Sequence, residues 1–131
     1  MASHKVFVYG SLKSGGTIRG LNQFGEGADI VGKATTTYPD YDMVDLGSFP
    51  GVFMGGTKYI QGEVWEVDDE VFADLDAIEG YPDFYSRTPT QTSKGKAWMY
   101  HLDKKQYGSF YADDPKSDSI TEVDNTLIWN L

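Results

Sequence analysis

Hydrophobic and polar residues alternate along much of the chain in the short runs that are typical of β-strands. The alternation is clearest from Tyr59 to Val67 (YIQGEVWEV), where apolar side chains fall on both faces of the expected strand. Burial of both faces indicates a strand within a barrel, or within a sheet that is covered on both sides. Further strands are expected over residues 5–9, 28–38, 41–46, 52–54, 84–92 and 96–102. The last two are expected to form a hairpin around Ser93-Lys94-Gly95.

One segment has the periodicity of a helix. Asp68 supplies an N-cap, and the two acidic residues that follow it favour a first helical turn. Gly80 is expected to end this helix, and Pro82 prevents its continuation. A shorter helical spacing over Thr17–Phe24 predicts a second, short helix. The apolar stripe of the first helix comprises Val71, Phe72, Leu75 and Ile78.

The composition is that of one folded domain. The chain has 131 residues, of which 40% are hydrophobic and 15% aromatic, enough to form a sizeable core. No repeat and no linker divides it, so residues 1–131 are predicted to form a single domain. The stretch from Lys104 to Asn125 is polar and rich in turn residues. The apolar residues Leu127, Ile128 and Trp129 that follow are expected to pack against the rest of the domain.

Charge and residue usage exclude several classes of function. Eleven basic and 20 acidic residues give a net charge of −9, which argues against nucleic-acid binding. A small anionic substrate is still compatible, because backbone N–H groups in a local pocket outweigh distant, screened surface charges. The absence of cysteine excludes disulfides, thiolate metal sites and cysteine nucleophiles. With two isolated histidines, a histidine-rich metal site or a histidine-based catalytic triad is also poorly supported.

The hydropathy of the chain predicts a cytoplasmic location. No apolar run approaches the roughly 18 residues of a membrane span. The first residues, MASHKVFVYG, contain too short an apolar stretch for a signal peptide. We therefore expect no membrane partner.

The turn Tyr9-Gly10-Ser11-Leu12 is a candidate binding loop. A strand that ends in glycine and serine leaves consecutive backbone N–H groups unpaired, and such groups can form an anion-binding concavity. The alternative is an ordinary strand-to-helix turn with a serine cap, since short motifs of this kind are weak evidence alone.

Glu79 is a candidate general base. It lies just past the apolar stripe of the expected helix, where Gly80 and Pro82 bend the chain. Partial burial of such a carboxyl would raise its pKa towards neutral pH and favour proton abstraction. The alternative is one more surface acid in an acidic protein.

Aromatic residues are dense after this helix. Tyr85 and Tyr100 are of interest because a buried hydroxyl needs a hydrogen-bond partner, although aromatic residues most often belong to the core. Arg87 lies two residues after Tyr85, on the same face of the expected strand. It could pair with an acid for structural reasons or help to hold a carboxylate.

Four segments carry a resemblance to a known family. They are VYGSLKSG (8–15), GSFPGV (47–52), GEVWEVDDEVFADLDAIEGYPDFYSR (62–87) and AWMY (97–100). In this order they resemble the γ-glutamylcyclotransferase-like family, which includes γ-glutamylamine cyclotransferases and plant avirulence-induced proteins. The pattern covers residues 6–102, and residues 103–131 form a C-terminal extension without an aligned pattern. The resemblance implies an α+β fold, a small mixed β-barrel with peripheral helices and a substrate cavity at its mouth.

The resemblance also implies a reaction and its residues. The substrate's α-amine would attack its own γ-carbonyl, giving 5-oxoproline and a free amine without a metal, a redox cofactor or a covalent enzyme intermediate. Glu79 would be the acid/base, and the remaining residues would bind the γ-glutamyl group. These substrate-binding residues are Tyr9, Gly10, Ser11, Leu12, Tyr85 and Tyr100.

Two other functions remain open at this point. The barrel could be a non-catalytic module that binds a small molecule or a protein, or it could be a lyase or transferase that acts on another amide. The partners that we expect are a small-molecule γ-glutamyl substrate and, in a homodimer, a second copy of the chain. A monomer is equally compatible with the sequence, which does not name the leaving amine.

Overall fold

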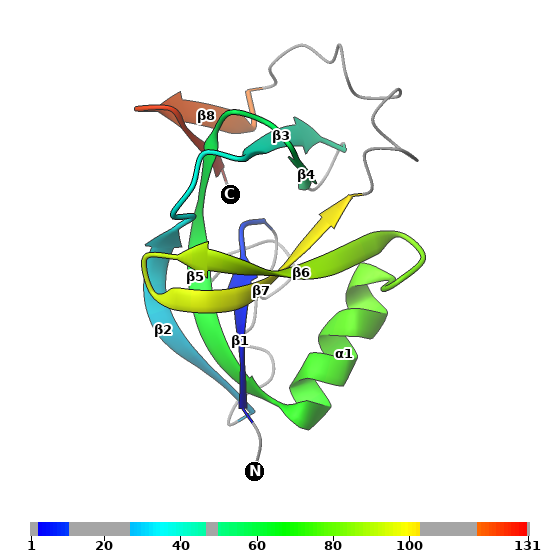
Figure 1. Cartoon of the computed structure of the whole chain (residues 1–131). Helices are drawn as coiled ribbons and strands as arrows, with labels where there is room; N and C mark the ends of the chain where they lie inside the picture. Colours follow the sequence, from blue (N-terminus) through cyan, green and yellow to red (C-terminus); the bar gives the residue numbers. More distant parts are fainter. Residues whose placement is uncertain (1–2, 11–26, 47–49, 103–117, 131) are drawn as a thin grey trace.

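Strand β5 (Tyr59–Asp68) lies at the centre of the fold and pairs with three other strands (Figure 1). The structure is a computed structural model that describes residues 3–10, 27–46, 50–102 and 118–130. β1 (Ser3–Val8) and β2 (Ala28–Thr35) run antiparallel to β5. β9 (Thr126–Trp129) runs parallel to it and pairs with Tyr59 and Ile60, beyond the end of β1. The strands that pair elsewhere are β3 (Tyr41–Asp45), β4 (Pro50–Met54), β6 (Tyr85–Thr92), β7 (Gly95–Leu102) and β8 (Ile120–Val123).

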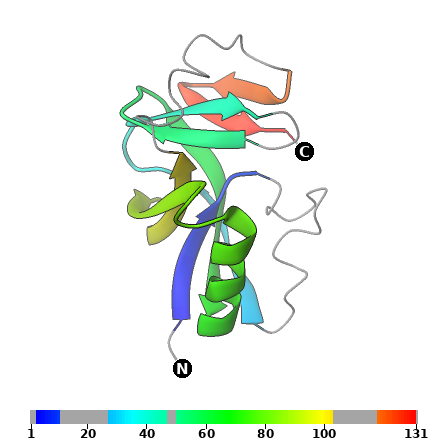
Figure 2. The same cartoon turned by 90° about the vertical axis from the view of Figure 1, so that its right-hand side faces the viewer.

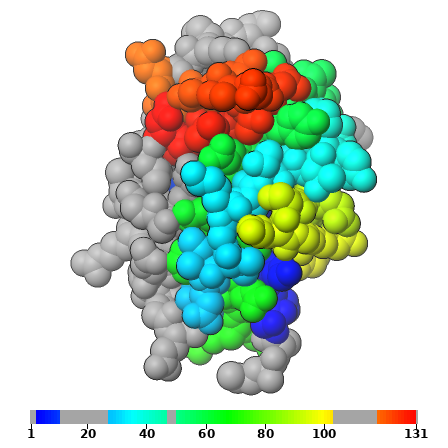
Figure 3. All heavy atoms as spheres, turned by 90° about the vertical axis from the view of Figure 1, so that its left-hand side faces the viewer, coloured from blue at the N-terminus to red at the C-terminus, as the bar shows by residue number. Residues whose placement is uncertain are grey.

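The sheet of the described residues is mixed and curls into a nearly closed barrel (Figures 1 and 2). β7 runs antiparallel to β6 and parallel to both β1 and β4. The far side closes where the β6–β7 hairpin meets the end of β2, and Figure 3 shows these two segments side by side. There the Ser93 N–H donates to the Thr35 carbonyl at 2.9 Å, and Thr36 bridges Thr92. The predicted small mixed β-barrel is therefore confirmed.

Helix α1 (Asp69–Glu79) begins and ends where the sequence predicts. The Asp68 carboxylate accepts a hydrogen bond from the Val71 N–H at 2.8 Å, which is the expected N-cap. Gly80 takes the left-handed conformation, with φ of 68°, that ends many helices and that a residue without a Cβ adopts at no cost. Val71, Phe72 and Leu75 are buried, whereas Ile78 is 49% exposed. The predicted stripe is thus wrong in the last turn of the helix.

Two apolar clusters lie on opposite faces of β5, as its two-sided pattern predicts. Trp65 and Val67 belong to the cluster that α1 covers. Ile60 and Val64 belong to the other, which includes Leu127 and Trp129 from β9. The expectation that the C-terminal apolar residues pack against the domain is confirmed for these two side chains, which are 2% and 5% exposed.

One segment differs from the prediction, and another lies outside the residues that the structure describes. The polar stretch predicted to be rich in turns contains β8, which pairs antiparallel with β9. The short helix predicted over residues 17–24 lies outside the described residues. Within the described ranges, no helix is both long enough and apolar enough to cross a membrane.

Candidate active site

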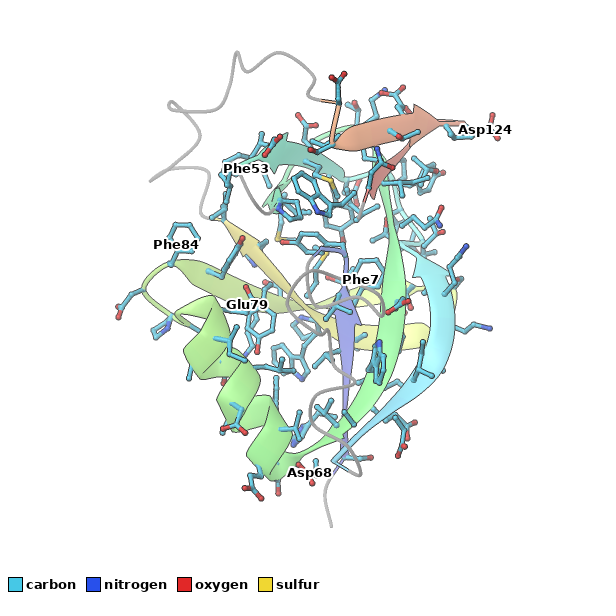
Figure 4. The ribbon with its side chains drawn as sticks, turned by 180° about the vertical axis from the view of Figure 1, so that it is seen from behind. Phe7, Phe53, Asp68, Glu79, Phe84 and Asp124 are labelled. Atoms are coloured by element: carbon cyan, nitrogen blue, oxygen red, sulfur yellow. The ribbon has the colours of Figure 1, made fainter. Side chains whose placement is uncertain are left out.

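Glu79 is the last residue of α1, at the end of the helix nearest β6 and β7 (Figure 4). Its side chain is half-buried, whereas its apolar neighbour Ile78 faces solvent. The final turn of α1 therefore inverts the amphipathic pattern of the rest of the helix. Such a local conflict between sequence pattern and fold is characteristic of functional sites.

Burial raises the pKa of Glu79 from 4.5 to about 7. The position on α1 acts in the same direction, because the C-terminal end of a helix disfavours negative charge. The last turn of α1 contains no basic residue that would offset this effect. The carboxyl can therefore both accept and return a proton near neutral pH, as an acid/base group must.

All three predicted pocket tyrosines are buried, and each donates its hydroxyl proton in a hydrogen bond to another group of the protein. Tyr9 donates to the carbonyl of Tyr100 at 2.7 Å. Tyr85 donates to the carbonyl of Pro50 at 2.8 Å. The Tyr100 hydroxyl donates to the Asp76 carboxylate at 2.6 Å. None of these three bonds uses the lone pairs of the tyrosine oxygens.

Tyr9 and Tyr100 share the electrostatic environment of Glu79. Burial raises the pKa of Tyr9 well above its usual value, and the charges of Tyr85 and Glu79 add to this shift. The pKa of Tyr100 is also raised, first by burial, then by the Asp76 carboxylate and by Glu79. The two hydroxyls therefore remain protonated next to the Glu79 carboxylate.

Gly10 lies at the end of β1, against strand β4. A Cβ on Gly10 would come within 2.6 Å of Cγ of Pro50, the residue whose carbonyl accepts from Tyr85. Glycine is thus required here by close packing, which the sequence alone could not distinguish from an approach to a ligand. Pro50 thus connects Gly10, which packs against its ring, to Tyr85, which donates to its carbonyl. The other two predicted loop residues, Ser11 and Leu12, lie outside the described residues.

Asp76 and Arg87 complete this region. Asp76 was not singled out from the sequence, although it lies three residues before Glu79 and so on the same face of α1. Arg87 donates to both of its carboxylate oxygens, from Nε at 2.9 Å and Nη2 at 3.2 Å. This pairing confirms that Arg87 binds an acid, and the partner is a residue of the protein.

The fold and this site together define a small β-barrel with a half-buried carboxyl of raised pKa at the end of its helix. A family model described as gamma-glutamyl cyclotransferase, AIG2-like, matches residues 6–122. The chain belongs to this family.

Individual relatives agree with this assignment. The gamma-glutamylcyclotransferase family protein YtfP of Escherichia coli strain K12 is 35% identical over 96 residues, which is 73% of this chain and 80% of that protein. Gamma-glutamylaminecyclotransferase C of Danio rerio is 36% identical over 97 residues, covering 70% of this chain and 63% of that protein. The family and these names indicate a cyclotransferase-like enzyme.

Solved structures support the fold. An AIG2-like protein from Mus musculus superimposes with a TM-score of 0.74 at 23% identity, over 100% of this chain and 97% of that one. The structure of YtfP from Escherichia coli gives a TM-score of 0.56 at 33% identity, over 76% of this chain and 82% of that one.

Proposed function

We propose that the protein cyclises the γ-glutamyl group of a γ-glutamyl amine or peptide to 5-oxoproline and releases the amine. The observation that carries the proposal is Glu79, a half-buried carboxyl with its pKa raised to about 7. It lies in an inverted helical turn, and its charge raises the pKa values of Tyr9 and Tyr100. A carboxyl that only served solubility would gain nothing from burial, which costs free energy.

The reaction needs one proton carrier and a folded substrate. Glu79 takes a proton from the α-ammonium group, and the freed nitrogen attacks the γ-carbonyl carbon. Glu79 then returns the proton to the departing nitrogen as the old C–N bond breaks. The ring nitrogen gives its surplus proton to the freed amine, so that a neutral five-membered lactam and an ammonium ion result. Because nucleophile and electrophile belong to one molecule, holding the substrate in a folded conformer supplies much of the rate acceleration.

The predicted binding residues would hold the two ends of the γ-glutamyl group. In this proposal the Tyr9–Leu12 loop binds the α-carboxylate through backbone N–H groups, and Tyr85 and Tyr100 line the pocket. Supporting this arrangement, Gly10 packs against Pro50, Pro50 accepts a hydrogen bond from Tyr85, and the charge of Glu79 raises the pKa of Tyr9.

The test is 5-oxoproline formation by the wild-type protein and by Glu79→Gln, on a panel of γ-glutamyl amines and dipeptides. General acid–base catalysis is worth about 100- to 10,000-fold, so the variant should lose at least that lower factor. Asp74→Asn, an exposed acid of the same helix, should retain wild-type turnover. Equal rates for Glu79→Gln and wild type would refute the catalytic role. Thermal stabilisation by 5-oxoproline without any turnover would instead favour a binding module.

A further inference from the structure

Asp76 is held on both sides by groups of the protein. Its Oδ1 accepts from the Tyr100 hydroxyl at 2.6 Å and from Nε of Arg87 at 2.9 Å. Its Oδ2 accepts from Nη2 of Arg87 at 3.2 Å. Two bonds from one planar guanidinium fix the orientation of the carboxylate, so the atom that faces Tyr100 cannot turn away.

Arg87 is itself fixed by three aromatic rings. Its guanidinium carbon lies 4.4 Å from the ring centroid of Phe72, 4.4 Å from that of Tyr81 and 4.6 Å from that of Trp98. Stacking of this kind suits a flat guanidinium and not the compact ammonium of lysine. Arg87 therefore supplies a counter-charge to Asp76 in a fixed place.

The hydrogen-bond inventory of Tyr100 has a chemical consequence. A phenol hydroxyl has one proton to donate and lone pairs that accept. The proton of Tyr100 is committed to Asp76, and the proton of Tyr9 is committed to the Tyr100 carbonyl. Neither hydroxyl therefore has a proton left to donate. The Tyr9 oxygen already accepts from the Val52 backbone N–H, whereas the Tyr100 oxygen can accept from a ligand. A carboxylate together with an acceptor oxygen matches a group that only donates, such as an ammonium.

We propose that Asp76 is a positioning residue: by taking the hydroxyl proton of Tyr100 it makes Tyr100 a hydrogen-bond acceptor for the α-ammonium group of the substrate. This inference rests on the proposed function, because it assigns the ammonium-binding part of the same site. Arg87 keeps Asp76 in place and does not touch the substrate. The site thus binds a ligand with an α-ammonium group more tightly than the same acid without that group.

Binding of glutamate and of glutarate tests this proposal, since the two ligands differ only in the α-ammonium group. Calorimetry at about pH 8 keeps Glu79 ionised in every sample. Wild type should bind glutamate more tightly than glutarate. Tyr100→Phe removes the acceptor, and the preference for glutamate should fall about 10-fold, the typical value of one hydrogen bond to a charged group.

The effect of Asp76 itself needs a variant that folds. Asp76→Leu alone leaves the Arg87 charge unpaired, whereas Asp76→Leu combined with Arg87→Met replaces the pair by apolar side chains of similar volume. In the double variant the Tyr100 proton is free to turn towards the ligand, and the glutamate preference should fall about as far as in Tyr100→Phe. Asp74→Asn is the matched control and should keep the wild-type preference.

The outcomes separate this inference from the proposed function. A glutamate preference that is unchanged in both variants, or equal weakening of both ligands, overturns the role of Asp76, whatever the turnover. A preference that depends on Asp76 in a wild-type protein that forms no 5-oxoproline overturns the proposed function alone. Failure of the wild-type protein to bind either ligand overturns both.

Discussion

The ionisation of Glu79 depends on where α1 ends. Its charge acts on Tyr9, which follows β1, and on Tyr100 of β7, and Tyr100 is hydrogen-bonded to Asp76, the partner of Arg87. Arg87 donates to Asp76 from both Nε and Nη2, so its positive charge is paired with the Asp76 carboxylate and not with that of Glu79. Burial therefore determines the ionisation of the Glu79 carboxyl by raising its pKa.

The raised pKa predicts the pH dependence of the reaction. Glu79 must be ionised to take a proton from the substrate, so kcat/KM should rise with pH through an apparent pKa of about 7 and level off above it. Initial rates of 5-oxoproline formation from about pH 5.5 to about pH 9 measure this limb. Rates that stay level down to the acid end of this range would show that Glu79 titrates as an ordinary glutamate, with a pKa near 4.5.

The same burial predicts a pH-dependent gain of stability in Glu79→Gln. The folded-state pKa of about 7 exceeds the ordinary 4.5, so the folded protein binds more protons and loses stability as pH rises between these values. A glutamine is never ionised. The variant should match wild type at about pH 5 and exceed it by on the order of 1 kcal/mol at about pH 8, after allowance for partial solvation. Urea unfolding at both pH values tests this, and a gain of equal size at both would contradict it.

Single residues also show what the sequence could not reveal. The acid/base candidate could be picked out because Gly80 and Pro82 mark the end of the helix. The role of Asp76 depends on Arg87 and Tyr100, which reach it from β6 and β7 and become its neighbours only in the folded barrel. The three-residue spacing between Asp76 and Glu79 was the one local signal available.

At the scale of elements, α1 is a rigid support for Glu79 whose boundaries are set by its caps. Asp68→Ala removes the hydrogen bond to the Val71 N–H and should lower the free energy of unfolding by about 1 kcal/mol. Asp74→Ala, an exposed position in the middle of the helix, should have no such cost, because alanine has the higher helix propensity. Denaturant unfolding of both variants compares them directly, and equal stabilities would show that the cap contributes nothing.

The element predictions succeeded where periodicity is strong and failed where packing overrides it. β5 was predicted over 59–67 and spans 59–68, because apolar residues on both of its faces enter the two clusters. β8 (ITEV) was missed because three of its four residues are exposed, and the strand is held by pairing with β9. The exposure of Ile78 could not be foreseen, since the helical period places it on the buried stripe.

At the scale of the whole molecule, β9 links the C-terminal hairpin to the barrel. Trp129 is 5% exposed within the cluster on one face of β5, and truncation there leaves a large cavity. Trp129→Ala should lower the free energy of unfolding by about 3–5 kcal/mol. Val123→Ala changes a residue of the same hairpin that is 51% exposed, and should cost about 0.5 kcal/mol or less. Chemical denaturation followed by circular dichroism distinguishes the two, and similar small losses would mean that the hairpin is not part of the cooperative unit.

The topology is the part that sequence patterns describe least. Alternation shows that a segment is a strand but not which strand lies beside it. The parallel pairs of β7 with β1 and β4, and of β5 with β9, join segments that are far apart along the chain. The two-sided pattern of β5 was compatible with a barrel or with a sheet covered on both faces, and the resemblance of the ordered motifs to a family favoured the barrel.

The pairing of β9 with the first residues of β5 has a consequence for protein synthesis. β1, β2 and β5 precede β9 along the chain, so they can leave the ribosome and pair while Tyr59 and Ile60 still have an open edge beside β1. An uncovered strand edge readily pairs with another chain. The interval before β9 arrives is therefore when a growing chain is most exposed to aggregation, and slow codons before residue 126 would lengthen it.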